Sequence, residues 1–221
     1  MVKWNNIDFK DKGIVVEKTP TISKGKKNID TYTIEGRNGF LSIDRGTYQP
    51  FSLSIECHAK ESANFDEIKA FLDGYGTLSF DGEREYTAIV SNAIPFEKVQ
   101  MFKSFVVQFM VNPIAHDITP TTITPSSTFT ITGATAKMYP TITLTAAAGG
   151  AEVNINGVEF ATSNEEATTY ILDCENKIIT KNGLNASNEM SGEFPYFKSG
   201  ENTYQGTDVT SITASYKKTY L

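Results

Sequence analysis

Few side chains in this 221-residue sequence can act as nucleophiles or metal ligands, because it holds only two cysteines and two histidines. Cys57 and His58 are adjacent, and a thiol beside an imidazole is one way to activate a nucleophile. The surrounding residues alternate as in a strand, so Cys57 is predicted to point inward and His58 outward to solvent. No Cys-x₂-Cys or His-x₃-His spacing occurs, and we expect no metal site.

Paired carboxylates are the other candidates, since two carboxyl groups can hydrolyse a glycosidic bond. Three such pairs occur: Glu83/Glu85, Glu165/Glu166 and Asp173/Glu175. The first two fall beside a turn and in a polar loop, where solvated carboxylates are the norm. The sequence also lacks a glycine-rich phosphate loop and a Gly-x-Ser-x-Gly motif. We therefore expect no enzyme, no catalytic residue and no cofactor.

One arginine stands out at a predicted bend, which reads Ile34, Glu35, Gly36, Arg37, Asn38, Gly39. The flanking apolar residues alternate with polar ones, as in two half-buried strands. Asn38-Gly39 favours a tight hairpin turn, because both residues tolerate positive φ. Arg37 would then present its five fixed donors from a bend, either to solvent or to a partner.

Composition sets the broad class of the protein. Apolar residues make up 39% and charged residues 21%, as in an ordinary globular protein. No run of 18 apolar residues occurs and the start lacks a secretory signal, so we expect synthesis in the cytoplasm, reduced cysteines and no membrane contact. The net charge is −6, without a basic stripe. Tight nucleic-acid binding is therefore not expected.

The first half predicts one mainly β domain, residues 1–115, with a single helix. An alternating strand covers 51–57, a helix 65–72 is capped by Asn64, and a hairpin spans 77–90. The nearly continuous apolar run 105–111 predicts a central strand covered on both faces.

Residues 116–127 are rich in Thr, Ser and Pro and are expected to form a linker. Beyond them, short strands alternate with turn signals such as Asn156-Gly157 and Asn182-Gly183. Residues 128–221 are therefore expected to form an antiparallel β-sandwich. The predicted fold class is mainly β.

The ordered series of segments resembles the distal tail (Dit) protein family of siphophages that infect Gram-positive bacteria. In the first half the resemblance rests on segments 11–17, 34–39, 71–78 and 109–113, although the family usually has Pro where Glu35 stands. In the second half it rests on 155–157, 171–175 and 194–202. The family often ends on a Trp-Arg pair, and Tyr216-Lys217 stands there instead.

The resemblance implies a structural protein of the virion tail tip, from a phage or prophage. Such proteins form a homo-hexameric ring through an N-terminal ring-forming domain and carry a C-terminal galectin-like β-sandwich. The implied partners are the tail tube protein, the tail-associated hub protein of the baseplate and a receptor-binding protein, with DNA passing through the ring. The hairpin Ile34–Gly39 would then meet a neighbouring subunit.

A second interpretation is a carbohydrate- or receptor-binding β-sandwich that attaches to the host cell wall. It would require an exposed aromatic platform on the second domain. Tyr170, Tyr196 and Tyr204 are the candidates there, since the only tryptophan, Trp4, lies in the first domain.

Overall fold

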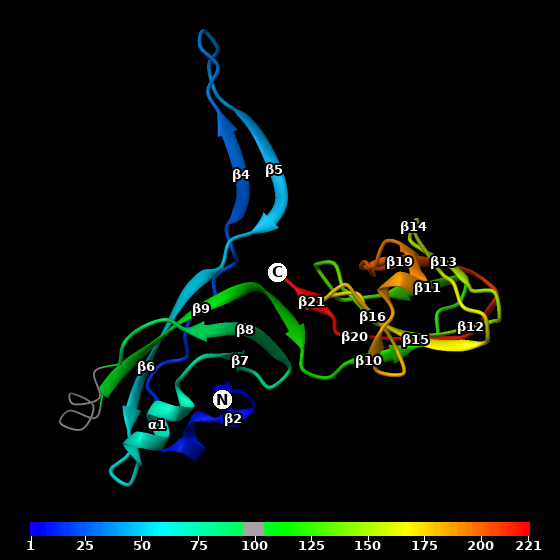
Figure 1. Cartoon of the computed structure of the whole chain (residues 1–221). Helices are drawn as coiled ribbons and strands as arrows, with labels where there is room; N and C mark the ends of the chain where they lie inside the picture. The colour runs from blue at the N-terminus through cyan, green and yellow to red at the C-terminus, as the bar shows by residue number, and fades with distance from the viewer. Residues whose placement is uncertain (95–103) are drawn as a thin grey trace. The chain divides into compact units, whose positions relative to one another are not determined.

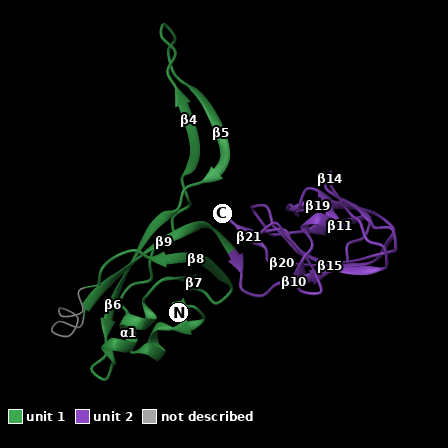
Figure 2. Cartoon of the chain, in the orientation of Figure 1, with its two compact units in different colours: residues 1–115, 221 green, residues 116–220 purple. Residues whose placement is uncertain are grey.

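The computed structural model describes residues 1–94 and 104–221, which form two compact units (Figures 1 and 2). Unit 1 comprises Met1–Ala115 with Leu221, and unit 2 comprises His116–Tyr220. Strand β9 (Ser104–Asp117) begins in unit 1 and ends in unit 2.

Unit 1 is built on an antiparallel sheet with the strand order β2-β1-β7-β8-β9-β6-β3; β21 (Thr219–Tyr220) pairs with β9 outside this order. Besides β9, its strands are β1 (Lys3–Trp4), β2 (Ile7–Asp8), β3 (Ile14–Val16), β6 (Phe51–Ala59), β7 (Tyr75–Ser79) and β8 (Arg84–Val90). A 3-10 helix, η1 (Phe9–Lys12), and the helix α1 (Phe65–Phe71) accompany the sheet.

The core of unit 1 lies on one face of this sheet. In β6, Leu53, Ile55, Cys57 and Ala59 are buried in strict alternation, which confirms the predicted strand and the inward direction of Cys57. The Trp4 and Phe109 rings lie 5.1 Å apart within the core.

Helix α1 packs onto this core through the fully buried Ile68. The Asn64 side chain caps its start by accepting hydrogen bonds from the backbone N–H groups of Asp66 and Glu67. The predicted helix and its cap are therefore confirmed, and the end falls one residue earlier than expected.

Strand β9 differs from its prediction. It is central in the sheet, between β8 and β6, but its residues are alternately exposed and buried from Ser104 to Asn112. Val106 and Met110 are exposed, so only one face of the strand is covered. The prediction that both faces of this strand are covered was therefore wrong. Among the described residues, no layer packs against its outer side chains.

Strands β4 (Lys27–Tyr32) and β5 (Leu41–Tyr48) pair only with each other and form a two-stranded antiparallel ribbon. Figure 1 shows this β4–β5 ribbon extending away from the main sheet of unit 1. The residues between the two strands form its tip.

Unit 2 is an antiparallel β-sandwich of two sheets. One sheet has the order β10-β20-β12-β15-β16-β17, made of β10 (Thr121–Ile123), β12 (Thr141–Ala146), β15 (Thr168–Asp173), β16 (Ile178–Lys181), β17 (Leu184–Asn185) and β20 (Val209–Tyr216). The other has the order β11-β19-β13-β14-β18, made of β11 (Thr128–Ile131), β13 (Glu152–Ile155), β14 (Val158–Thr162), β18 (Met190–Gly192) and β19 (Gly200–Thr207). A 3-10 helix, η2 (Ser187–Glu189), precedes β18.

The inner faces of both sheets supply the core of unit 2, including Ile142 and Leu144 from one and Ile155 and Phe160 from the other. The predicted turns form where expected: the first residue of each Asn-Gly pair has a φ of 56° or 52°, and the glycine has 82° or 77°. Positive φ at both central residues is typical of type I′ hairpin turns.

Residues 116–127, expected to be a linker, contain the end of β9 and the edge strand β10. Thr121, Thr122 and Ile123 pair with β20, and β-branched residues suit such a strand. Pro120 and Pro125 lie just outside β10, where a missing N–H costs no ladder hydrogen bond.

Candidate assembly surface: the β4–β5 ribbon

The β4–β5 ribbon has one mainly apolar face. Tyr32 lies directly opposite Leu41, and Asp30 lies opposite Ile43, so these residues share a face of the antiparallel pair. Ile34 continues the same alternation beyond β4. Tyr32, Ile34, Leu41 and Ile43 are 50%, 44%, 48% and 51% exposed. The alternation predicted from the sequence is thus present, but nothing within the described chain buries this apolar face.

Polar contacts hold the base of the ribbon. Arg45 Nε donates to Asp30 Oδ2 at 2.7 Å, and Lys27 forms an ion pair with Asp44. The hydrogen bond from Lys27, together with one from the Gly46 backbone, lowers the pKa of the Asp44 carboxyl from its ordinary value. These exposed contacts link the two strands without covering the apolar face.

The tip turns at a different place than predicted. The Arg37 backbone N–H donates to the Ile34 carbonyl at 3.2 Å, so the four-residue turn is centred on Glu35-Gly36. Gly36 has a φ of 78°, as the third residue of a type II turn requires. Asn38 does not have positive φ, whereas Gly39 does. The predicted tight turn at Asn38-Gly39 is therefore wrong, because a longer loop places its left-handed residues at the two glycines.

Arg37 lies exposed at this tip. Its side chain makes no hydrogen bond or ion pair with any residue of the described chain. The guanidinium is therefore available to a group outside the subunit.

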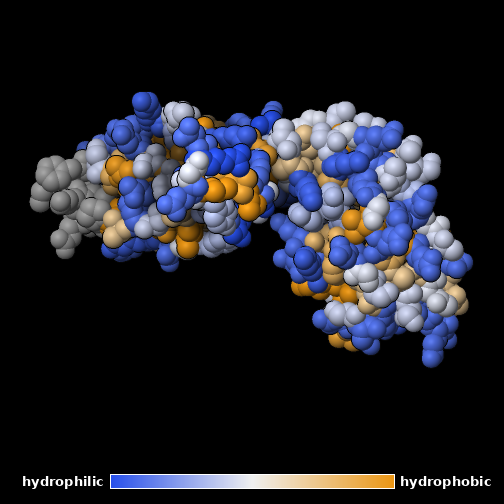
Figure 3. All heavy atoms as spheres, turned by 90° about the horizontal axis from the view of Figure 1, so that it is seen from above, coloured by the Kyte–Doolittle hydropathy of each residue, from blue (hydrophilic) through white to orange (hydrophobic). Residues whose placement is uncertain are grey.

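A second apolar surface lies on the outer face of the unit 1 sheet. Val106 and Met110 of β9 are exposed there, opposite Glu56 and Ser52 of β6. On the face that Figure 3 draws, hydrophobic residues in orange lie among hydrophilic residues in blue. The sequence prediction missed these two as surface residues, although the polar residues Ser104, Gln108 and Asn112 lie on the same side of the strand and mark it as the exposed side.

The thiols are not reactive in this fold. Cys57 and Cys174 are both buried and free, and burial raises the pKa of each to about 12. A thiol is a nucleophile only when ionised, so neither is suited to catalysis near neutral pH. The His58 Nδ1 atom lies 3.4 Å from the Ser104 hydroxyl and does not contact Cys57.

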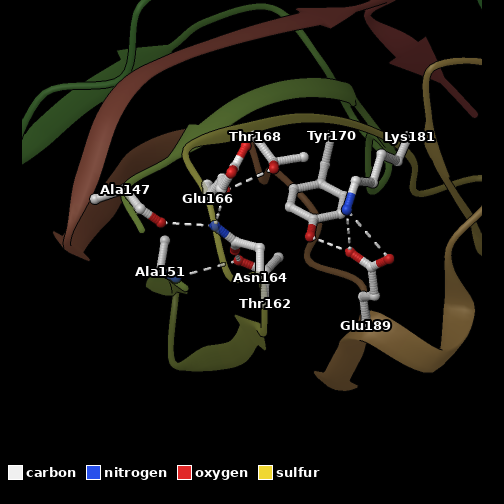
Figure 4. A network of polar contacts seen from close by, with 9 residues as sticks. All are labelled: Ala147, Ala151, Thr162, Asn164, Glu166, Thr168, Tyr170, Lys181 and Glu189. Atoms are coloured by element: carbon white, nitrogen blue, oxygen red, sulfur yellow. Dashed lines mark hydrogen bonds and ion pairs between the residues drawn. The ribbon is translucent and has the colours of Figure 1, made fainter. Parts of the chain in front are cut away.

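A buried tyrosine of unit 2 has a charged partner pair. The Tyr170 hydroxyl donates to Glu189, and Lys181 Nζ lies 3.0 Å from Glu189 Oε2 (Figure 4). Burial and the neighbouring carboxylate raise the pKa of Tyr170, whereas hydrogen bonds from Tyr170 and Lys181 lower that of Glu189. Both shifts move the groups away from neutral pH, which suits a structural contact better than general acid–base chemistry.

Of the predicted carboxylate pairs, Asp173/Glu175 lies at a turn that the Asp173 side chain holds. Partial burial by itself would raise the pKa of Asp173, but hydrogen bonds from the side chain and backbone of Asn176 and from the Glu175 backbone lower it overall. Asp173 therefore orders the turn after β15. The carbonyl of Glu166 accepts from Asn164, whose side chain also donates to the Ala147 carbonyl and so joins two loops (Figure 4).

The three tyrosines proposed for a sugar platform are not brought together. Tyr170 is fully buried and Tyr204 packs against the core. Tyr196 is partly exposed and lies next to Tyr139, with ring centroids 6.3 Å apart. However, Lys137 Nζ lies 3.9 Å from the centre of the Tyr196 ring and occupies one of its two faces.

Residues 1–94 and 104–221 contain no group of three or more His, Cys, Asp or Glu residues arranged to hold a metal ion. In the same described part of the chain, no helix is long and apolar enough to cross a membrane.

Residues 122–220 match the family model of the siphovirus-type tail component, C-terminal domain, which is named for the Dit protein of phage SPP1. No curated protein matches the chain. Among solved structures, the chain is similar to the crystal structure of SPP1 Dit, with a TM-score of 0.76 and 15% sequence identity. The match covers 100% of this chain and 98% of the SPP1 chain. That protein is described as a paradigm of the hub adsorption apparatus in phages that infect Gram-positive bacteria.

The structural match fits the mainly β architecture of both units, and the family model covers nearly all of unit 2. Unit 2 thus matches the family model of the C-terminal domain of siphovirus-type tail components, and the whole chain has a fold similar to that of SPP1 Dit.

Proposed function

We propose that this tail component assembles through unit 1 into a hexameric ring at the virion tail tip. The ring joins the tail tube to the tail-associated hub protein, and unit 2, as a galectin-like sandwich, anchors the receptor-binding protein. The family match and the description of SPP1 Dit as part of a hub adsorption apparatus support this role. The protein works as a scaffold and not as an enzyme.

The observation that carries the proposal is the uncovered apolar face of the β4–β5 ribbon. A two-stranded hairpin alone is marginally stable in water, and it gains stability when a second layer covers it. Each square ångström of apolar surface that a neighbour removes from water contributes about 25 cal/mol. Contact with a second copy of the chain supplies that layer for Tyr32, Leu41 and Ile43.

A ring needs two different surfaces on every copy, because its contacts run head to tail. The ribbon is one candidate, and the outer sheet face around Val106 and Met110 is the other. We infer that the ribbon of one subunit covers the outer sheet face of the next. Six such contacts, related by a rotation that closes the ring, would cover the apolar ribbon face and the outer sheet face of every subunit.

The charge of the chain fits a ring through which DNA passes. The net charge is −6, and acidic residues repel phosphate groups. A basic lumen would instead retain the DNA during ejection. The role therefore needs no nucleic-acid site on this protein.

The test compares the two faces of the ribbon in the full chain. Leu41→Ser with Ile43→Ser removes the apolar face, whereas Thr31→Ala with Ser42→Ala alters two paired residues of the opposite face and serves as the control for position. Light scattering after gel filtration and negative-stain imaging, with and without the tail tube and hub proteins, measure assembly. We expect rings for the wild type and the control and monomers for the apolar-face variant. Rings of all three proteins, or a wild type that stays monomeric even with its neighbours, would contradict the proposal.

A further inference from the structure

A hollow of about 410 Å³ lies on the five-stranded sheet of unit 2. Its polar lining comes from four neighbouring strands, β19, β13, β14 and β18. The residues are Glu152, Asn154, Glu159, Ser191, Gln205 and Thr207. They alternate with core residues such as Val153, Ile155 and Phe160, so they belong to the outer face of the sandwich.

The strand register explains why the outer face is hollow. Glu152 pairs with Thr207 on one side and with Ala161 on the other, and Ala161 pairs with Ser191. The small Ala161 side chain therefore forms a low point between longer neighbours. Beside it, Gly192 has a φ of 95°, and a Cβ there would lie 2.4 Å from the Glu159 carbonyl oxygen. Only glycine lets β18 approach so closely.

The polar groups around the hollow form two rows. Gln205, Asn154 and Glu159 lie side by side in one row, parallel to the row of Thr207 and Glu152. Asn154 Nδ2 donates to Glu159 Oε1 at 2.9 Å, and Asn154 Oδ1 accepts from the Gly157 backbone at 2.9 Å. These two hydrogen bonds hold the Asn154 side chain, in the middle of the groove, in one orientation.

The remaining groups are free to meet a ligand. Within the described residues, the side chains of Glu152, Ser191, Gln205 and Thr207 have no hydrogen-bond or ionic partner. Together they offer a carboxylate, an amide and two hydroxyls, which are matched donors and acceptors for closely spaced hydroxyl groups. The groove is concave, as small-molecule sites are, but its one aromatic residue, Phe160, is buried, so it differs from the stacking platform expected from the sequence and relies on these polar groups.

We propose that this groove binds a neutral saccharide. No Lys, Arg or His lines it, so its two carboxylates disfavour uronic acids and phosphorylated sugars. A purely apolar ligand would leave the polar rows unpaired. A basic peptide fits less well, because amides and hydroxyls outnumber carboxylates and Glu159 is already hydrogen-bonded to Asn154. This binding is independent of ring formation, and its failure would leave the proposed scaffold role intact.

Saturation-transfer NMR on the full chain tests the ligand class. The probes are glucose, N-acetylglucosamine, maltose and chitobiose, with glucuronic acid and glucose 6-phosphate as anionic counterparts and pentalysine as the basic peptide. An array of neutral glycans widens the search. We expect saturation transfer from the protein to at least one neutral sugar, with a dissociation constant on the order of 1 mM. Anionic counterparts should bind at least about fivefold more weakly, a difference of about 1 kcal/mol. Absence of binding to every neutral glycan overturns the proposal.

Three variants locate the site. Ala161→Leu fills the hollow and Gln205→Ala removes one exposed amide; each should weaken sugar binding at least about fivefold while the unfolding midpoint is retained. Glu201→Gln is the control, because Glu201 lies on the same strand, β19, as Gln205 but outside the groove. Sugar binding that both Ala161→Leu and Gln205→Ala leave unchanged, or pentalysine binding that a fourth variant, Glu152→Gln, abolishes, would overturn the assignment. If Ala161→Leu fails to fold, Gln205→Ala carries the test.

Discussion

Strands β5 of unit 1 and β12 of unit 2 have the same alternating pattern and different surroundings. In β12, Ile142 and Leu144 are fully buried under the opposite sheet of the sandwich. In β5, Leu41 and Ile43 alternate just as regularly, but about half of each side chain is exposed. Alternation thus defines a face, whereas burial requires a second layer, and that layer can belong to another subunit.

The exposed sheet faces of the two units differ in the kind of side chains that they carry. Unit 1 exposes apolar side chains on its ribbon and on its main sheet, which suits contact with other copies. The open sheet of unit 2 carries carboxylates, amides and hydroxyls around a groove. Unit 2 also exposes Ile171, Ile178 and Leu184 away from the groove, so the contrast holds for the five-stranded sheet and not for the whole unit.

Truncating one phenylalanine in the core and one in the ribbon should separate folding from assembly most strongly. Phe109 is fully buried against Trp4, so Phe109→Ala should lower the free energy of unfolding by about 3–5 kcal/mol. Phe40 is 70% exposed at the ribbon tip, and Phe40→Ala should change it by less than about 0.5 kcal/mol. Urea unfolding at low protein concentration gives both values. A large loss for Phe40→Ala would show that the ribbon packs within its own subunit.

Local signals in the sequence predicted many elements correctly. Asn156-Gly157 and Asn182-Gly183 form the expected turns, and Asn64 caps the expected helix, because neighbouring atoms alone decide these features. Tertiary features were predicted less well. The run 105–111 was assigned two covered faces, yet composition cannot show whether a layer covers each side of a strand.

The candidate sites show the same limit. The bend at Arg37 was found from its glycines, but the turn formed at Glu35-Gly36, since loop length and not the Asn-Gly pair set the geometry. The groove was not found at all. Glu152, Glu159 and Gln205 are far apart in sequence and meet only through strand register. The one available signal was polar alternation in the short strands of unit 2.

Two asparagines provide the next comparison between the units. Asn202 is fully buried and its side chain makes four hydrogen bonds: it accepts from Lys198 N and Asn156 Nδ2 and donates to the carbonyls of Lys198 and Gly200. Asn202→Ala leaves these groups unpaired and should cost about 2–3 kcal/mol. Asn38→Ala, in the exposed ribbon tip, should cost less than about 0.5 kcal/mol. Thermal unfolding measures both, and equal losses would contradict the assignment of Asn202 as the internal support of its loop.

A smaller effect is expected for Tyr170→Phe, which removes the hydroxyl that donates to Glu189 and should cost about 2 kcal/mol near neutral pH. The pKa of Glu189 is lowered in the folded state, so the contact stabilises at pH values above the ordinary carboxyl pKa. That stability is lost as the pH falls through the folded pKa. The difference between Tyr170→Phe and wild type should therefore shrink in acid, as urea unfolding at several pH values can show. A difference that stays constant into strong acid would contradict the role of Glu189.

The smallest expected effect on folding, and a selective one on assembly, belongs to Arg37→Ala. Arg37 has no partner in the described part of its own subunit, so the free energy of unfolding of the monomer should stay within about 0.5 kcal/mol of wild type. In the ring, a bidentate contact with a carboxylate of the neighbouring subunit would fix the register of the ribbon. Arg37→Lys keeps the charge and loses the planar fork, so it serves as the matched control. We expect rings of Arg37→Ala to dissociate at lower salt than wild-type rings, with Arg37→Lys in between, when light scattering is followed across a salt series. Unchanged yield and salt tolerance of the Arg37→Ala rings would leave the arginine as a solvated tip and reduce the assembly surface to the apolar face alone.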